Sequence, residues 1–212
     1  MPSLLCIETS PRAQSVSSSL THEFLASLTE QVPGLDVKHR NLTELALANL
    51  DGDGIEALRA SPANVTAEQQ ATIKRSDALI DELKAADAIL IAAPMHNFSV
   101  PATLRTWIDY VVRPGLCFAY GDQGPYGLLS DKPVLVISAR GGDYGDPESP
   151  AAYDQQTPYL KQILGFIGLR SVKIIAANGM DMGEEPRSSG IAAARAALEA
   201  YSPKFAQALS AA

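Results

Sequence analysis

The segment AILIAAPMHNF, residues 88–98, decides how this chain folds. Its first part is an uninterrupted apolar run, which is typical of a strand that is buried on both faces. A short loop follows, and from Leu104 to Val111 apolar residues recur at the spacing i, i+3, i+4, i+7. That spacing indicates an amphipathic helix, with Pro101 in its first turn. The segment therefore predicts a buried strand, a loop and a helix in succession.

The same succession recurs on both sides of this segment. Further short apolar runs predict strands at residues 4–9, 35–40, 134–138 and 171–177. Helical patterns follow most of these strands, at residues 17–31, 153–167 and 188–201. A capping box at Thr66 and Gln69 opens one more helix, which runs to about residue 85.

Two stretches do not fit this alternation. Residues 41–64 contain Asn, Asp, Gly and Pro and predict a long loop with a short helix, and residues 113–130 predict an excursion or a hairpin. The rest alternates between strand and helix, which favours an α/β fold with a parallel sheet and helices on both faces. We expect one domain over residues 1–212, with five strands in the order 2-1-3-4-5.

Bulk properties limit the function. The 212 residues are 46% hydrophobic, enough for a buried core, and the net charge of −7 argues against a general surface for nucleic acid or acidic membranes. No apolar run approaches the roughly 20 residues that span a bilayer. The N-terminus lacks a basic region before Leu4, and Cys6 and Cys117 lie far apart, so we expect a cytoplasmic protein.

The loop after the first predicted strand carries many hydroxyl groups. It reads SPRAQSVSS over residues 10–18 and opens a helix. Serine is common at helix starts because it caps them, and a single cap needs one serine. Several hydroxyls, with Arg12 nearby, also suit a phosphate at the positive end of a helix dipole. Both interpretations stay open from this loop alone.

Two more loops follow strands and suit a flat ligand. In PMHNF, residues 94–98, Met95 and Phe98 either fill the core or pack on a ring, and Asn97 can bond to the polar edge of the ring. Gly141-Gly142 after the fourth strand allows a close backbone approach or is an ordinary loop. Because all three loops leave the carboxyl edge of one sheet, we expect them to form one site.

Other chemistries lack their motifs. The sequence contains neither G-x-x-x-x-G-K-[ST] nor the G-x-S-x-G nucleophile elbow. His22, His39 and His96 lack metal-ligand spacing with Cys or carboxylates, so we expect no metal. Residues 52–57 fit a dinucleotide pattern, but no strand precedes them and acidic residues would repel a pyrophosphate. We interpret them as a turn before a short helix.

These motifs resemble those of a known family. The serine loop, PMHNF with VPATLRTWID over residues 100–109, Arg140-Gly141-Gly142, and GLCFAY with GPYGLL over residues 115–129 resemble the bacterial azoreductases, the FMN-dependent NADH:azo/quinone reductases. The resemblance covers essentially the whole chain, and the extended middle motif is its most specific part. It implies a flavodoxin-like fold, with FMN at the switch between strands one and three.

The resemblance also implies an activity. It implies a homodimer with one noncovalent FMN per subunit and a substrate pocket at the dimer interface. NADH or NADPH would be the donor, and a quinone or azo compound would take the hydride in a two-electron, ping-pong reaction. Carried over by position, the phosphate is held by Ser10, Ser15, Val16 and Ser17. The ring is lined by Pro94, Met95, His96, Asn97, Phe98, Ala139, Arg140, Gly141 and Gly142, and the pocket aromatics are Phe118 and Tyr120.

Two departures from the family concern His96 and Ala139. The family often has an aromatic residue, commonly Tyr, in place of His96, and often Ser in place of Ala139. Backbone contacts survive both changes, but pocket shape and substrate preference are put in doubt. His96 either packs against the ring or donates a proton to the acceptor, and we favour packing. The alternative functions are a flavodoxin-like electron carrier and a non-catalytic flavin-binding protein.

Overall fold

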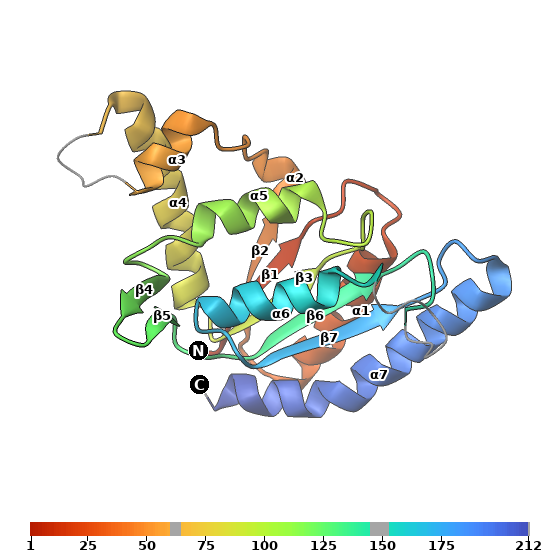
Figure 1. The fold of residues 1–212 in the computed structure, drawn as a ribbon. Helices are drawn as coiled ribbons and strands as arrows, with labels where there is room; N and C mark the ends of the chain where they lie inside the picture. Colours follow the sequence, from red (N-terminus) through yellow and green to blue (C-terminus); the bar gives the residue numbers. More distant parts are fainter. Residues whose placement is uncertain (60–64, 145–152, 212) are drawn as a thin grey trace.

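The computed structural model, which describes residues 1–59, 65–144 and 153–211, is built on a five-stranded parallel sheet (Figure 1). Its order β2-β1-β3-β6-β7 confirms the predicted order of the five strands. The strands are β1 (Ser3–Glu8), β2 (Asp36–Asn41), β3 (Ala88–Ala92), β6 (Val134–Ala139) and β7 (Val172–Ala177). The excursion holds an antiparallel hairpin of β4 (Phe118–Gly121) and β5 (Gly124–Gly127).

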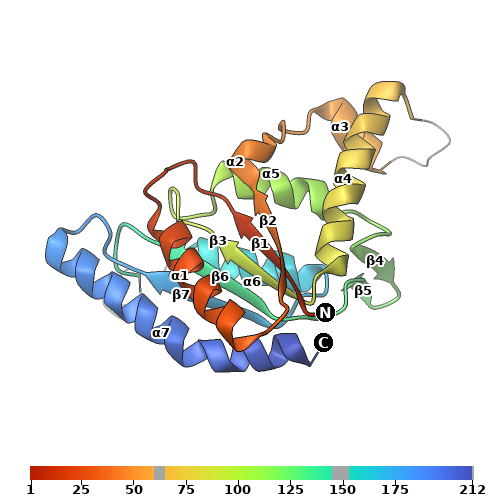
Figure 2. The same cartoon turned by 180° about the vertical axis from the view of Figure 1, so that it is seen from behind.

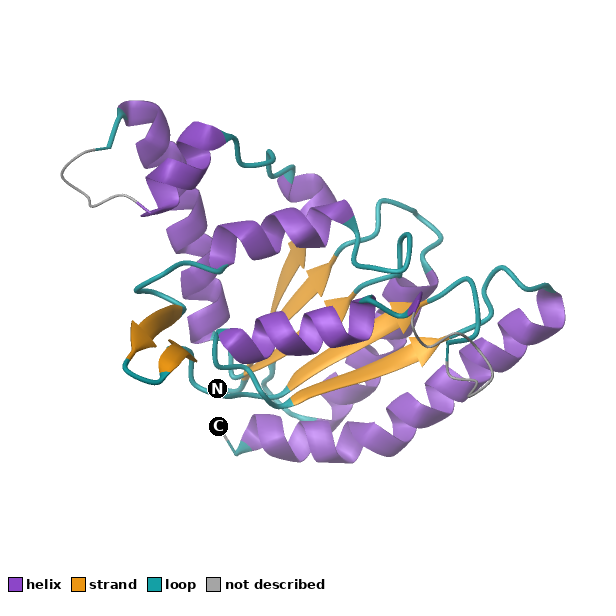
Figure 3. Cartoon of the chain, in the orientation of Figure 1, coloured by secondary structure: helices purple, strands orange, loops and turns teal. Residues whose placement is uncertain are grey.

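Helices cover both faces of the sheet, as predicted. One face is covered by α4 (Ala67–Ala85), α5 (Ala102–Val111) and α6 (Gln156–Phe166) (Figure 3). The opposite face is covered by α1 (Val16–Gln31) and α7 (Glu184–Ser210) (Figure 2). The predicted capping box opens α4, where Gln69 N donates to Thr66 Oγ1 and Thr66 N donates to Gln69 Oε1.

The core lies in two layers on either side of the sheet. Side chains alternate along a strand, so Leu5 and Ile7 of β1 join one layer while Leu4 and Cys6 join the other. Every residue of the central strand β3 is buried, which explains its uninterrupted apolar run. Full burial of one such Leu or Ile contributes about 1.5–3 kcal/mol. The sheet is therefore a rigid support for the loops at its carboxyl edge.

The predicted long loop contains more structure than expected. Two short helices, α2 (Leu42–Leu45) and α3 (Gly52–Arg59), lie within it, and residues 60–64 lie outside the described residues. The side chain of Asn41 caps α2, and Gly54 N donates to Asp51 Oδ1 at the start of α3. The dinucleotide-like pattern is thus the helix itself, and our interpretation of it as a turn before a helix was wrong in that detail.

Three helix boundaries also differ from prediction by three residues or more, and one of them is the start of α7, at Glu184 rather than at residue 188. α6 begins at Gln156 rather than at residue 153, because the Asp154 side chain accepts a hydrogen bond from Thr157 N and defines the first turn. α7 continues past residue 201 through Pro203 to Ser210. A proline usually ends a helix, but Phe205 and Leu209 beyond it are buried in the core. Their burial outweighs the lost backbone hydrogen bond.

Candidate functional site

The three predicted loops meet at the carboxyl edge of the sheet, where they border a cleft of about 210 Å³. This is the edge at which open α/β sheets bind ligands. The cleft is lined by most of the residues predicted to bind a cofactor: Ser10, Ser15, Val16, Pro94, Met95, His96, Ala139, Arg140 and Gly141. Four others, Ser17, Asn97, Phe98 and Gly142, belong to the same three loops but are not among the residues that line it.

The serine loop leaves the positive end of α1 open. Ser15 caps the helix, with Ser18 N donating to its Oγ at 3.3 Å, and its Oγ lies 3.0 Å from Ser17 Oγ. Both serines are buried. In the described part of the chain, no hydrogen bond uses the N–H groups of Val16 and Ser17. A single serine serves as the cap, so the second hydroxyl and the two N–H groups remain for an anion.

A strained turn follows β3. His96 and Ser99 exchange backbone hydrogen bonds of 3.0 Å, and between them Asn97 and Phe98 have φ values of 47° and 69°. Asn tolerates this conformation, but a Phe there costs on the order of 1–3 kcal/mol. His96 and Asn97 are exposed on the turn. Strain of this kind persists where the surrounding structure holds it, and such turns cluster at functional sites.

Aromatic rings support the turn from outside. Phe98 is 43% exposed, and its ring stacks on Tyr153 with centroids 5.2 Å apart. A second ring contact, with Tyr144, is T-shaped with centroids 6.4 Å apart. Phe98 is therefore not a core filler, which was one of the two interpretations of the loop sequence.

The glycine loop is hydrogen-bonded to the loop after β7, which was not among the predicted site loops. Backbone N–H groups of Gly179, Met180 and Asp181 donate to the carbonyls of residues 142, 140 and 141, each at 3.0 Å. A Cβ on Gly141 would lie 2.5 Å from Asp181 Oδ2, so a larger residue here would have to displace the Asp181 carboxylate. The N–H groups of Gly141 and Gly142 have no partner among the described residues. The loop therefore offers two donors to a ligand.

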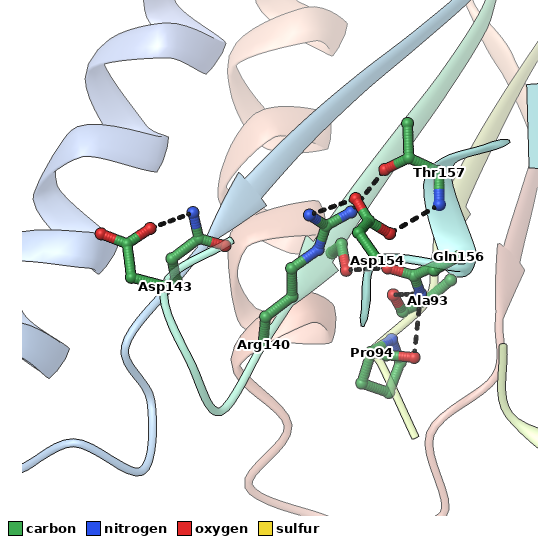
Figure 4. A network of polar contacts seen from close by, with 9 residues as sticks. Ala93, Pro94, Arg140, Asp143, Asp154, Gln156 and Thr157 are labelled. Carbon is green, nitrogen blue, oxygen red and sulfur yellow. Dashed lines mark hydrogen bonds and ion pairs between the residues drawn. The ribbon is translucent and has the colours of Figure 1, made fainter. Parts of the chain in front are cut away.

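The Arg140 side chain has a different role from the predicted one. Figure 4 shows its guanidinium turned toward the start of α6, where Nη1 lies 3.0 Å from Asp154 Oδ2 and Nη2 donates to Thr157 Oγ1 at 2.8 Å. Burial raises the pKa of Asp154, but hydrogen bonds from Thr157 and the charge of Arg140 lower it more, and the net pKa is below its usual value. The Arg140 backbone is also engaged, since its N–H donates to the Ala177 carbonyl at 2.9 Å. Of the side-chain nitrogens of Arg140, only Nε has no hydrogen-bond partner among the described residues.

Four further residues line the cleft and were not predicted from the sequence. They are Gln14, Met180, Asp181 and Arg187. Three of them come from the segment after β7, and Arg187 Nη1 donates to the Met180 carbonyl at 3.2 Å. The rule that located the other loops, that ligands bind beyond the carboxyl ends of strands, applies equally to the last strand. Residues 178–187 after β7 therefore account for three of the four, and Gln14 lies within the serine loop itself.

The predicted pocket aromatics do not reach this cleft. Phe118 is buried, with its ring 4.5 Å from that of Phe166, whereas Tyr120 is 75% exposed. Neither lines the cleft. Helix α5 leads away from the cleft, with a rise of about 1.5 Å per residue. The hairpin follows this helix in the chain and therefore lies at its far end (Figure 1).

A second, larger hollow lies on the α5 side of the molecule. It has a volume of about 510 Å³ and is bordered by residues of α3, α5 and α6. The apolar side chains Leu50, Ile55 and Ile163 lie in it, together with Arg105, whose guanidinium stands 5.3 Å above the ring of Tyr159. The hollow therefore combines apolar side chains with the charged groups of Arg105 and Asp109.

Two other kinds of feature are absent from the described ranges. No cluster of three or more His, Cys, Asp or Glu side chains could hold a metal ion there. No described helix is both long and apolar enough to cross a membrane.

Comparisons with known proteins agree on the family. The model of a family described as "Flavodoxin-like fold" matches residues 2–201. An FMN-dependent NADH:quinone oxidoreductase of Paraburkholderia phymatum is 43% identical over 201 residues, covering 94% of this chain and all of the relative. A protein of the same name in Trichormus variabilis is 42% identical, with coverage of 93% and 97%.

Solved structures point the same way. An azoreductase from Bacillus anthracis superposes with a TM-score of 0.89 at 27% identity, covering 97% of this chain and all of that one. An FMN-dependent NADH-azoreductase from Bacillus anthracis in complex with FMN superposes with a TM-score of 0.88 at 25% identity, covering 97% of this chain and all of that one. The chain therefore belongs to the flavodoxin-like family of FMN-dependent NADH:quinone oxidoreductases and azoreductases.

Proposed function

We propose that this protein is an FMN-dependent NADH oxidoreductase that reduces quinones and azo compounds. The observation that carries the proposal is the cleft at the carboxyl edge of the sheet, where a helix start with spare donors faces a strained turn and a glycine loop. Relatives that match nearly the full chain are named for this activity with quinones. A likeness in fold alone would not carry the chemistry.

The donor set of the cleft fits FMN. The opening of α1 suits one phosphate, held by Ser10, Ser15, Val16 and Ser17. The ring would lie between the two other loops, against residues 94–98 and 139–142. The N–H groups of Asn97, Gly141 and Gly142 have no partner among the described residues, and they match the several acceptor atoms on the polar edge of a flavin.

The side chains have little acid–base work to do. When bound, FMN supplies the two-electron chemistry, taking hydride from NADH and giving it to the acceptor. The protein binds and orients the partners, and the N–H groups of the glycine loop would stabilise negative charge on the ring. No thiol takes part, because both cysteines are buried and burial raises the pKa of Cys6 to about 12. The two free cysteines also suit the cytoplasm, where we place the protein.

Two measurements test the function. Mass spectrometry of the cofactor released from the purified protein should give FMN, and NADH oxidation should depend on added menadione. Release of FAD as the only flavin would contradict the single phosphate site. Bound FMN without turnover would favour a carrier or a non-catalytic flavin protein instead.

We further propose that the protein acts as a homodimer. The hollow of about 510 Å³ against α3, α5 and α6 exposes apolar side chains that a second copy can cover. In the dimer, the exposed Tyr120 of the hairpin would reach the cleft of the other subunit, and Phe118, buried in its own subunit, would support the Tyr120 ring at a centroid distance of 5.6 Å. Light scattering at micromolar concentration should give twice the mass of the chain. A stable and active monomer would contradict the proposal.

A further inference from the structure

Gln156 is a fully buried polar side chain at the first position of α6. Its Nε2 donates to the carbonyls of Ala93 at 3.1 Å and Pro94 at 3.2 Å, and its Oε1 accepts from Ser138 Oγ at 2.7 Å (Figure 4). The side chain thus spans the ends of β3 and β6. An amide does this because it carries two donors and an acceptor on one rigid plane.

The two carbonyls mark the place where the chain leaves the sheet. Ala93 N and Met95 N still donate to carbonyls of the β6 strand, those of Ile137 and Ala139, at 2.9 Å. The Ala93 and Pro94 carbonyls face α6 instead, and a buried carbonyl without a donor costs about 1–3 kcal/mol. Gln156 therefore fixes the direction in which residues 94–98 depart from the sheet.

Neighbouring residues of the same short segment hold both loops. Gln155 N donates to the carbonyl of Phe98 at 3.0 Å, and the Tyr153 ring stacks on Phe98. On the other side, Asp154 and Thr157 bind the guanidinium of Arg140. Residues 153–157 are thus a clamp between the turn after β3 and the glycine loop after β6.

We propose that Gln156 is a positioning residue for the flavin ring, which sets the spacing between these two loops. This inference rests on the proposed function. A planar ring contacts both loops at once, so its affinity depends on their separation, whereas the phosphate contacts only the serine loop on α1. Loss of the Gln156 bridge should therefore weaken binding of the ring and leave the phosphate contribution unchanged.

The test compares Gln156→Leu with Gln155→Leu. Gln155 is the adjacent residue, its side chain is exposed and makes no capping hydrogen bond, and its backbone N–H is kept in the variant. The dissociation constants of FMN and of riboflavin, which lacks the phosphate, are measured on apo-protein by quenching of flavin fluorescence. Melting of each apo-protein, followed by circular dichroism, shows that the variants are folded at the assay temperature.

In Gln156→Leu both dissociation constants should rise by about tenfold or more, and by the same factor, as expected when a buried amide leaves its partners unpaired. Gln155→Leu should stay within about twofold of the wild type for both ligands, the range of exposed substitutions. A variant of the phosphate site, Ser17→Ala, should lose affinity for FMN but not for riboflavin. If the dissociation constants of FMN and riboflavin rise by the same factor, the loss comes from the position of the ring and not from damage to the serine loop.

Several outcomes would overturn the inference. Wild-type affinities in a folded Gln156→Leu protein would show that the bridge serves stability alone. If Gln156→Leu does not fold, Ser138→Ala provides the test, because it removes only the hydroxyl that orients Gln156. The dissociation constants of FMN and riboflavin should then each rise by about fivefold. If both dissociation constants are unchanged in Ser138→Ala, the inference is overturned. A wild-type protein that binds neither flavin would refute the proposed function and this inference together.

Discussion

Asp154 and Arg140 form the most buried ion pair at the site, with 16% and 6% of their side chains exposed. The pKa of Asp154 is lowered, so the stability that it contributes is present above the unfolded value near 3.8 and is lost as the pH falls through the folded value. Asp154→Asn leaves the guanidinium without its counter-charge and should cost about 2–4 kcal/mol at pH 7. Urea unfolding from about pH 7 to pH 3 should show the difference from wild type shrinking below about pH 4.

Asp131 provides a matched control for that prediction. Burial raises its pKa, but hydrogen bonds from Ser171 and Arg170 lower it more, so the net pKa is also below its usual value. It lies just before β6, at the edge of the sheet away from the cleft. In Asp131→Asn, the loss in free energy of unfolding relative to wild type should also shrink as the pH falls, and the dissociation constant of FMN should not change. A difference between Asp154→Asn and wild type that grows as the pH falls would contradict the assigned pKa direction.

His96 poses a question of role that kinetics can answer. It lines the cleft on the strained turn, and its side chain has no partner among the described residues. If it only packs, as we expect, His96→Tyr should leave kcat/KM for menadione within a few fold. A proton donor would show a drop of roughly 10²-fold in His96→Ala, confined to the half-reaction with menadione. Stopped-flow measurement of the two half-reactions distinguishes these outcomes.

The sequence predicted the backbone loops of the site more accurately than it predicted the partners of individual side chains. The Ser, Pro94–Phe98 and Gly141-Gly142 loops were located because each follows an apolar strand. The role of the Arg140 side chain was not predictable, since its partner Asp154 lies 14 residues away across a stretch without any periodic pattern. Proximity across such a gap is a property of the fold, not of the local sequence.

At the scale of elements, the start of α1 gives a direct test of phosphate binding. Ser17 is fully buried and does not cap the helix, but its Oγ is hydrogen-bonded to Ser15 Oγ, so Ser17→Ala should lower the free energy of unfolding by about 0.5–1.5 kcal/mol. Its FMN dissociation constant should rise by about tenfold, the scale of one hydrogen bond to a charged group, while that for riboflavin stays unchanged. Ser15→Ala should in addition lower the free energy of unfolding by about 1 kcal/mol, because it removes the cap. Fluorescence titration and thermal melts measure the two effects. Equal losses for both flavins in Ser17→Ala would contradict a phosphate at this helix start.

The sheet was predicted more closely than the helix ends. Strands buried on both faces need continuous apolar runs, and β3 and β6 are buried along nearly their whole length. Helix ends depend on contacts that the sequence does not display. α7 passes through Pro203 because of packing beyond it, and α3 forms where polar residues suggested a turn. Tertiary burial overrode local propensity in the first case, and the Asp51 cap did so in the second.

At the scale of the whole molecule, the position of the cleft predicts the kinetic order. The cleft of about 210 Å³ opens at one edge of one sheet, and the ring proposed to lie there would expose one face to reactants. NADH and the acceptor would then occupy the same place in turn, so NAD⁺ must leave before menadione enters. Double-reciprocal plots against NADH at several menadione concentrations should be parallel.

Product inhibition gives the control for that order. NAD⁺ and menadione would compete for the same reduced form of the protein, so NAD⁺ should inhibit competitively against menadione and not against NADH. The measurement needs the dimeric protein, because the proposed pocket includes Tyr120 from the hairpin of the other subunit, whose side chain is 75% exposed on its own chain. Tyr120→Ala should raise the KM for menadione and keep the lines parallel. Intersecting lines in the wild type would mean that donor and acceptor bind together, and the single shared face would be wrong.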